Sequence, residues 1–179
     1  MRKVVILLVC LSALTLPLAA QELWLGAGGL VIPETGNLAY STAHQELQLS
    51  AGWFQPAGKR FALNFGLATD TVDAQRWLVR HAFTDGPVAE WSRRYYALDV
   101  EAHYLLTPGS RLAVTAFVGP SLMRSGDITW GGLKAGVLGR YSLGEHLTAG
   151  AEVACRHADA GPCGAYTVGE VALRVGWRF

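Results

Sequence analysis

The last nine residues, Val171-Ala-Leu-Arg-Val-Gly-Trp-Arg-Phe179, alternate between large apolar side chains at odd positions and small or basic ones at even positions. A period of two residues is typical of a β-strand with two chemically different faces. The termini of soluble domains usually fray into polar residues, and this one does not. The stretch therefore predicts an ordered final strand with a strongly apolar face that ends on aromatic rings.

The same alternation recurs through the chain. It predicts seven further strands, over Glu22–Val31, His44–Phe54, Arg60–Thr69, Arg93–Leu106, Arg111–Met123, Thr129–Leu143 and Glu145–Arg156. The first and fifth carry apolar residues on both faces, so their registers stay open. Most of these segments reach the roughly 9 to 11 residues that a tilted membrane strand needs. Connections after the second, fourth and sixth strands are short, and those after the first, third and seventh are longer.

The N-terminus has the pattern of a secretory signal peptide. Arg2 and Lys3 precede an apolar run over Val4–Leu16, and small Ala19 and Ala20 follow. We therefore expect residues 1–20 to be a signal peptide and residues 21–179 to be a single domain. That domain is rich in apolar residues, glycine and tryptophan, yet no later segment approaches the roughly 18 apolar residues of a membrane helix. No basic patch indicates a nucleic-acid partner.

The face opposite the apolar one carries both signs of charge. It collects Glu46, Asp99, Glu101, Lys134, Arg140, Glu152, Arg156, Glu170, Arg174 and Arg178. Such residues could pair inside a narrow barrel that side chains fill. The apolar face carries aromatic residues close to the short turns, namely Trp53, Phe61, Tyr104, Tyr141, Trp177 and Phe179. Rings gathered at one level indicate a membrane-interface girdle, which the alternative of a soluble sandwich with an exposed charged face leaves unexplained.

The chain resembles the small eight-stranded outer-membrane proteins of the OmpA-barrel, OmpX and OmpW type. The glycine-rich segment Gly131–Tyr141, which is similar to their penultimate hairpin, and the terminal strand Val171–Phe179 carry the resemblance. It implies an all-β fold, an eight-stranded antiparallel up-and-down transmembrane β-barrel in the cell outer membrane. It also implies that membrane lipid surrounds the chain and that the barrel-assembly machinery reads Phe179. We expect a monomer with both termini periplasmic.

Two classes of function stay open. The first is a non-enzymatic structural or surface-interaction barrel with a filled interior, and the second is a narrow channel or lateral transporter for small hydrophobic molecules. The connection over residues 70–92 is unusually apolar, with Trp77, Leu78, Val79, Phe83 and Trp91. It either covers the barrel mouth or offers a contact surface to a partner or apolar ligand.

Enzymatic chemistry is the least favoured alternative. The resemblance extends to lipid A deacylase barrels, which carry a His-x-Ser-Asn segment before the last strand. Here His157 is followed by Ala158 and Asp159, and Glu170 lies further on. A serine hydrolase needs a hydroxyl beside its histidine base, and none stands in this stretch. We therefore expect a loop histidine at the barrel rim, a degenerate site at most, and no catalytic residues.

Two smaller features bear on chemistry. Cys155 and Cys163 flank the predicted loop over 157–164, and in an oxidising compartment they form either a disulfide or two free thiols. His103 shares a face with Asp99 and Glu101. This trio fits either a metal site or a histidine in an interior hydrogen-bond network, and we favour the network because no second histidine or cysteine joins it. We expect no metal and no cofactor.

Overall fold

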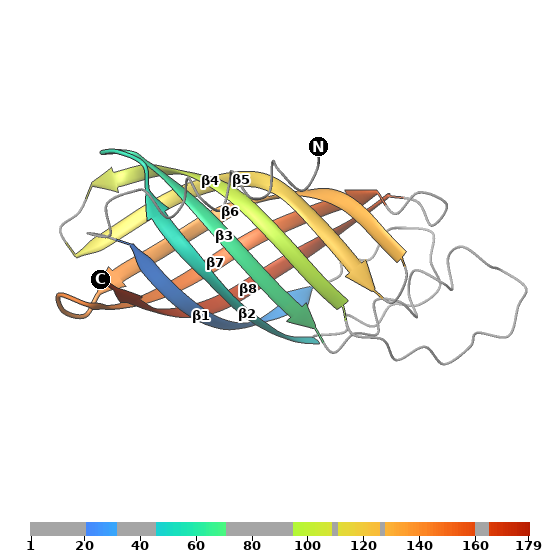
Figure 1. Cartoon of the computed structure of the whole chain (residues 1–179), viewed down its shortest axis with the longest axis horizontal. Coiled ribbons are helices and arrows are strands. Elements are labelled where there is room, and N and C mark those ends of the chain that lie inside the picture. Colours follow the sequence, from blue (N-terminus) through green and yellow to red (C-terminus); the bar gives the residue numbers. More distant parts are fainter. Residues whose placement is uncertain (1–20, 32–45, 71–94, 109–110, 126–127, 160–164) are drawn as a thin grey trace, which may run out of the picture.

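A computed structural model describes residues 21–31, 46–70, 95–108, 111–125, 128–159 and 165–179. They form eight antiparallel strands in one closed barrel, in which each strand pairs with its neighbours in sequence and the last pairs with the first (Figure 1). The strands are β1 (Glu22–Val31), β2 (Glu46–Pro56), β3 (Phe61–Asp70), β4 (Tyr95–Pro108), β5 (Leu112–Ser125), β6 (Ile128–Ser142), β7 (Leu147–Asp159) and β8 (Ala165–Arg178). The predicted up-and-down β-barrel is confirmed. Among the described residues, no helix is long and apolar enough to cross a membrane.

The two ends of the barrel differ. At one end, which we call the turn end, β2 passes to β3 through residues 57–60 and β6 passes to β7 through residues 143–146. The start of β1 and the end of β8 lie at this same end (Figure 1). The connections that follow β1, β3, β5 and β7 all leave from the opposite end, which we call the loop end. The connections after β1, β3 and β7 contain more residues than those at the turn end, as in outer-membrane barrels, whereas the connection after β5 spans only residues 126–127.

The two faces of the wall follow the alternation of the sequence. Nine of the ten charged side chains predicted for the interior are buried or half-buried there, and the side chain of the tenth, Glu46, lies outside the described residues. The outer face carries large apolar side chains that are strongly exposed, up to 70% for Leu25 and 68% for Leu173. The barrel is therefore inverted relative to a soluble protein, with its charges inside and its apolar surface outside.

The structure also settles the two open registers. In β1, Trp24 points inward and is buried, while Leu23 and Leu25 point outward. In β5, Thr115 and Phe117 point inward. A register shift between Leu105 and Thr107 in the pairing of β4 with β5 adds an unpaired residue near the turn end.

Several predicted boundaries were wrong. The predicted loop over 157–164 begins too early, because β7 continues to Asp159 and β8 starts at Ala165 rather than at Val171. Backbone pairing of His157 with Thr167 and of Asp159 with Ala165 extends both strands. Asp70, placed in the long connection, is the last residue of β3, where it pairs with Tyr95. Residues 71–92 of that connection lie outside the described residues.

Candidate functional site in the barrel interior

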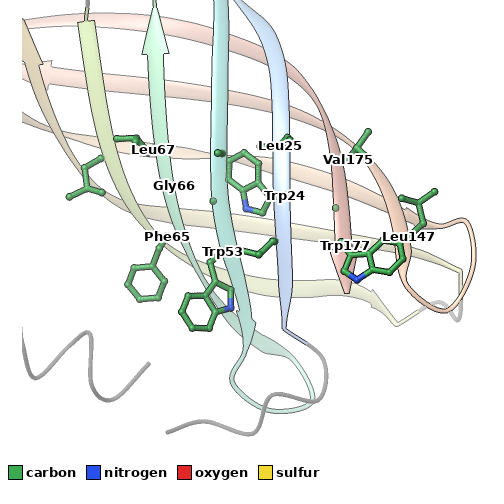
Figure 2. A pocket seen from close by; sticks show the side chains of 14 residues that line it. Trp24, Leu25, Trp53, Phe65, Gly66, Leu67, Leu147, Val175 and Trp177 are labelled. Carbon is green, nitrogen blue, oxygen red and sulfur yellow. The ribbon is translucent and has the colours of Figure 1, made fainter. Parts of the chain in front are cut away.

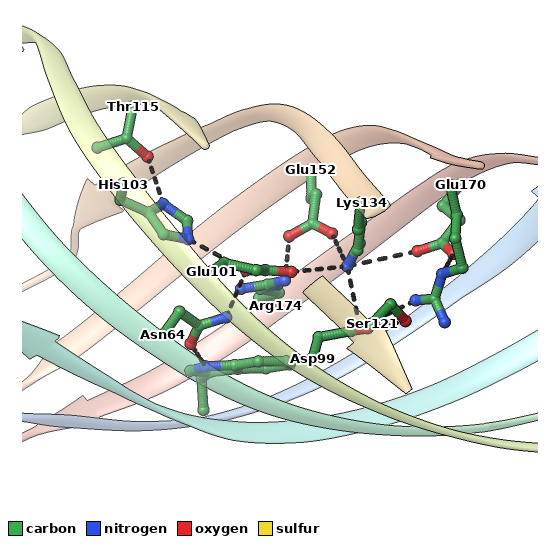
Figure 3. Close-up of polar contacts among 12 residues, drawn as sticks. Asn64, Asp99, Glu101, His103, Thr115, Ser121, Lys134, Glu152, Glu170 and Arg174 are labelled. Atoms are coloured by element: carbon green, nitrogen blue, oxygen red, sulfur yellow. Dashed lines mark hydrogen bonds and ion pairs between the residues drawn. The ribbon is translucent and has the colours of Figure 1, made fainter. Parts of the chain in front are cut away.

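The centre of the interior is an ion cluster around Lys134, which projects from β6 (Figure 3). Its Nζ atom lies 2.8 Å from Glu152 Oε1, 3.1 Å from Glu101 Oε1, 3.4 Å from Glu170 Oε2 and 3.6 Å from Asp99 Oδ2. All five side chains are buried. One ammonium group thus joins carboxylates from β4, β7 and β8, so it crosslinks the two sides of the barrel.

Gly119 on β5 lies beside this cluster, at a close approach of two strands. It is paired directly with Lys134, and it stands between β6 and the carboxylates of β4. A Cβ atom at this position would lie 2.7 Å from the Cα atom of Glu101 and would also collide with the carbonyl oxygen of Val100. Glycine at this position therefore lets β5 approach the backbone of β4 closely, beside the carboxylates of Glu101 and Asp99.

Two arginines bring the cluster to three cations against its four carboxylates. Arg156, only 1% exposed, places Nη2 at 2.9 Å from Asp99 Oδ2 and Nε at 2.7 Å from Glu170 Oε1. Arg174 is in direct contact with Glu152 through its Nη2 atom. The hydroxyl of Ser121 donates to Asp99 Oδ1 at 2.5 Å. Buried charges are tolerable only when they are paired in this way, so the cluster has the composition that a dry interior demands.

Hydrogen bonds continue from the cluster in two directions, towards Trp24 on β1 and towards Thr115 on β5 (Figure 3). Trp24 Nε1 donates to Asn64 Oδ1 at 2.8 Å, and Asn64 Nδ2 donates to Glu101 Oε2 at 2.7 Å. His103 Nε2 lies 3.1 Å from the same Glu101 oxygen, and its Nδ1 lies 3.1 Å from Thr115 Oγ1. The histidine predicted to join an interior network does so. Among the described residues, no group of three or more potential ligands is arranged to hold a metal ion.

Aromatic rings fill the space between these polar groups. The His103 ring stacks on Phe117 with centroids 4.8 Å apart and meets Phe54 edge-on at 5.2 Å. The Arg174 guanidinium carbon lies 3.8 Å from the centroid of the Trp24 ring, within the range of a cation–π contact. The inward rings of Trp24 and Phe117 were not predicted, because their strands carry apolar residues on both faces, whereas Phe54 has the even position of the inward residues of β2.

A second ion group lies towards the turn end. Glu22 Oε2 is 3.3 Å from Arg140 Nη1 and 4.0 Å from Arg178 Nη2. The Arg140 guanidinium carbon also lies 3.8 Å from the centroid of the Phe54 ring. The sequence analysis missed Glu22 as a partner, since the register of its strand was open. Its even position, shared with Trp24, was the available signal.

Little free space remains inside. Two interior cavities were found within the described barrel, each of about 10 Å³, one beside Arg140 and Glu22 and the other beside Lys134 and Asp99. Each has room for about one water molecule. Small barrels of eight strands have interiors that side chains can fill, and this one is filled by ion pairs and rings.

The candidate hydrolase residues are arranged differently from the prediction. His157 lies within β7 rather than in a loop, and its side chain is exposed on the outer face. Its Nδ1 atom is 2.9 Å from the hydroxyl oxygen of Thr167 on β8, so a hydroxyl is present across the strands although none follows in sequence. Glu170 is buried inside the barrel, on the opposite side of the wall. The acid thus cannot orient this histidine.

Cys155 is exposed on the outer face of β7. Cys163 lies outside the described residues, so the disulfide between them stays a prediction.

Comparison with solved structures places this architecture among known proteins. Neisserial surface protein A matches with a TM-score of 0.61 and 11% identity, over 89% of this chain and 97% of that one. Ail, the attachment invasion locus protein of Yersinia pestis, matches with a TM-score of 0.59 and 11% identity, over 90% of this chain and 99% of that one. The chain has the fold of small outer-membrane β-barrels. The outer-membrane protein OprG of Pseudomonas aeruginosa matches at a TM-score of 0.55 and 13% identity, over 90% and 96% of the two chains.

These likenesses concern the fold alone, because the identities are low. No protein-family model matches the chain, and no curated protein matches it by sequence. The neighbours are outer-membrane barrel proteins of differing roles, and no single subfamily among the OmpA, OmpX and OmpW types is indicated.

Proposed function

We propose that this chain is exported and resides in the outer membrane as an integral, monomeric barrel. The exposed apolar belt supports this location, because each 100 Å² of apolar surface left in water forgoes about 2.5 kcal/mol. The outward rings of Phe61, Tyr104, Tyr141 and Trp177 near the turn end suit a membrane interface. The test is electrophoresis of the membrane fraction, in which the folded barrel migrates faster unheated than boiled. A soluble periplasmic protein without a heat shift would contradict the proposal.

We further propose that the barrel is a closed, non-enzymatic scaffold that holds its loops at the cell surface. The observation that carries this proposal is the Lys134 cluster, in which one ammonium group and four carboxylates occupy the centre of the interior. A hydrated ion needs a continuous wide path, and the cluster lies at the centre of the interior between two cavities of only about 10 Å³ each. The alternative is a narrow channel or a lateral transporter for small hydrophobic molecules.

Conductance in planar lipid bilayers separates these alternatives. The refolded protein, shown to be inserted by its heat shift, should give no discrete current steps under symmetric salt. Boiled protein added in the same detergent is the matched control for leakage caused by detergent. Reproducible unitary steps from the folded protein alone would overturn the closed-scaffold proposal and favour the channel.

The surface role would fall to the connection between β3 and β4. Its residues 71–92 carry Trp77, Leu78, Val79, Phe83 and Trp91, which is an apolar composition for a surface segment. Ail, one of the structural neighbours, is an attachment invasion protein, and one of its structures holds a heparin analogue. We propose by this analogy that the segment contacts a surface partner or an apolar ligand.

A loop-shortened variant tests this role. Asp70 pairs with Tyr95 at the loop end, so a short glycine-containing turn can replace residues 71–94 without breaking the barrel. The variant should keep its heat shift and lose adhesion of expressing cells to host-cell or matrix surfaces. A matched variant with the connection after β1 shortened (residues 32–45) should keep adhesion. Unchanged adhesion after loss of residues 71–94 would remove the proposed role.

A further inference from the structure

The outer face carries a groove that the filled interior does not explain. It lies near the turn end, has a volume of about 710 Å³ and crosses β1, β2, β3 and β8. Figure 2 shows Trp53 and Phe65 on one side of it and Val175 and Trp177 on the other. The groove is formed by apolar side chains and glycine backbone, so it is built to hold hydrocarbon rather than a polar ligand.

The strand register explains why the surface is hollow there. Trp53 pairs with Leu23 and with Phe65, and these residues form one row of large outward side chains. One level further from the turn end, Ala51 pairs with Leu25 and with Leu67. The methyl group of Ala51 therefore lies between two exposed leucines and below a tryptophan, which leaves a depression on the central strand of the groove.

The same β2–β3 hairpin carries positive charge at its turn. Lys59 and Arg60 are both exposed, and Arg60 Nη1 donates to the hydroxyl oxygen of Tyr104 at 3.0 Å. The turn is well defined, since Ala57 N donates to Phe61 O at 2.8 Å and Gly58 has a φ of 126°. That left-handed conformation favours glycine and fixes the direction of the next two residues.

The positive charges and the apolar groove follow one another along the hairpin in the same order as the headgroup and the acyl chains of a lipid. Phe65 comes five positions after Arg60, which is about 17 Å along a strand at roughly 3.4 Å per residue. Between them lies Phe61, whose ring meets that of Tyr104 edge-on at 5.2 Å and which belongs to the aromatic girdle. From the turn towards the middle of the barrel, the hairpin thus presents cations, interfacial rings and an apolar groove.

We propose that this hairpin is a binding site for an anionic phospholipid, with one acyl chain in the groove above Ala51 and the headgroup phosphate on Lys59 and Arg60. Arginine matches a phosphate with paired donors, and lysine adds a second positive charge. The exposed charges described elsewhere at the turn end, Arg111 and Glu145, are of opposite sign, so net positive charge is concentrated on this turn. The site rests on the proposed membrane location of the barrel.

Native mass spectrometry of the refolded protein in nonionic detergent tests the site. The probes are phosphatidylglycerol and phosphatidylcholine with identical dioleoyl chains, titrated separately. Wild-type protein should retain one phosphatidylglycerol molecule with at least about fivefold preference over phosphatidylcholine, in line with two charge-assisted contacts. The double variant Lys59→Gln/Arg60→Gln should bring that ratio close to one. The matched control Arg111→Gln, which removes one exposed charge from another turn, should keep the preference.

A second variant addresses the groove. Ala51→Phe fills the depression from the outer face and should reduce retention of both lipids to less than about half. An equal retention of the two lipids by wild-type protein, or an undiminished preference in the double variant, would overturn the site. The heat shift of each preparation keeps the two proposals apart. A heat-shifted barrel without lipid preference contradicts the site alone, whereas a chain that never acquires a heat shift contradicts the membrane location and the site with it.

Discussion

Replacing Lys134 by methionine removes the cation on which four carboxylates converge while keeping a long, unbranched side chain. In the variant, Arg156 and Arg174 would be the remaining basic side chains in ion pairs with Asp99, Glu152 and Glu170, and Glu101 would keep its contacts with Asn64 and His103. The carboxylates are buried, with Glu101 only 1% exposed, and the adjoining cavity of about 10 Å³ has room for about one water molecule, so water can replace few of the lost contacts. We expect a large loss of stability with an unchanged fold.

The magnitude follows from the geometry. At about 3 Å and an effective dielectric constant of about 20, a single ion pair is worth roughly 5 kcal/mol before desolvation is subtracted. Lys134 makes four such contacts, at 2.8 to 3.6 Å, and its own burial offsets much of the sum. Removing one partner of a buried pair typically costs about 3–5 kcal/mol, because it leaves an uncompensated charge. We expect a loss in that range.

The assay is urea unfolding of the refolded protein in detergent micelles, followed by tryptophan fluorescence and by the unheated electrophoretic shift. The double variant Lys134→Met/Glu152→Gln is the matched comparison, since it removes one of the orphaned charges as well. It should recover part of the loss, and the difference measures the coupling between the two groups. A loss below about 1 kcal/mol for Lys134→Met would equal that of an exposed pair and would refute the dry, closed interior.

Three further predictions follow from single positions. Gly119→Ala should lower the unfolding free energy by about 1–3 kcal/mol, because its Cβ would lie 2.7 Å from the Cα of Glu101. The control Gly131→Ala on the outer face, where a Cβ would have nothing within 4 Å, should change that free energy by less than about 0.5 kcal/mol. Equal effects of the two substitutions would contradict the close approach at Gly119. Deletion of Phe179 should lower the fraction of heat-shifted barrel in the membrane, whereas Phe179→Tyr should assemble normally, and full assembly of the deletion variant would speak against the terminal signal. Cys155 should react with a maleimide only after reduction, and labelling of the unreduced protein would exclude the disulfide with Cys163.

The sequence was sufficient for the fold because a barrel wall separates two environments residue by residue. A shift of one residue would exchange Arg174 with Val175, and the cost of a charge in an apolar environment makes such slips unfavourable. Alternation in β4, β6, β7 and β8 therefore identified the inward charges correctly. The strand ends were harder, because β7 and β8 extend to Asp159 and Ala165 through pairing with each other rather than through their own composition.

The partners inside the barrel could not be predicted, and the reason is geometric. Alternation assigns a residue to a face but carries no information about height or about which strand lies across the interior. Lys134 on β6 meets Glu101 on β4 across β5, and there Gly119 lets the backbones of β4 and β5 approach closely. Trp24 has a place inside because Asn64, the strand partner of Glu101, accepts its hydrogen bond and donates a second one to Glu101. An interior network therefore depends on its charges and also on small residues that set the spacing of the strands. A side chain at Gly119 would push β4 and β5 apart at the level of Glu101, even if every charge were kept.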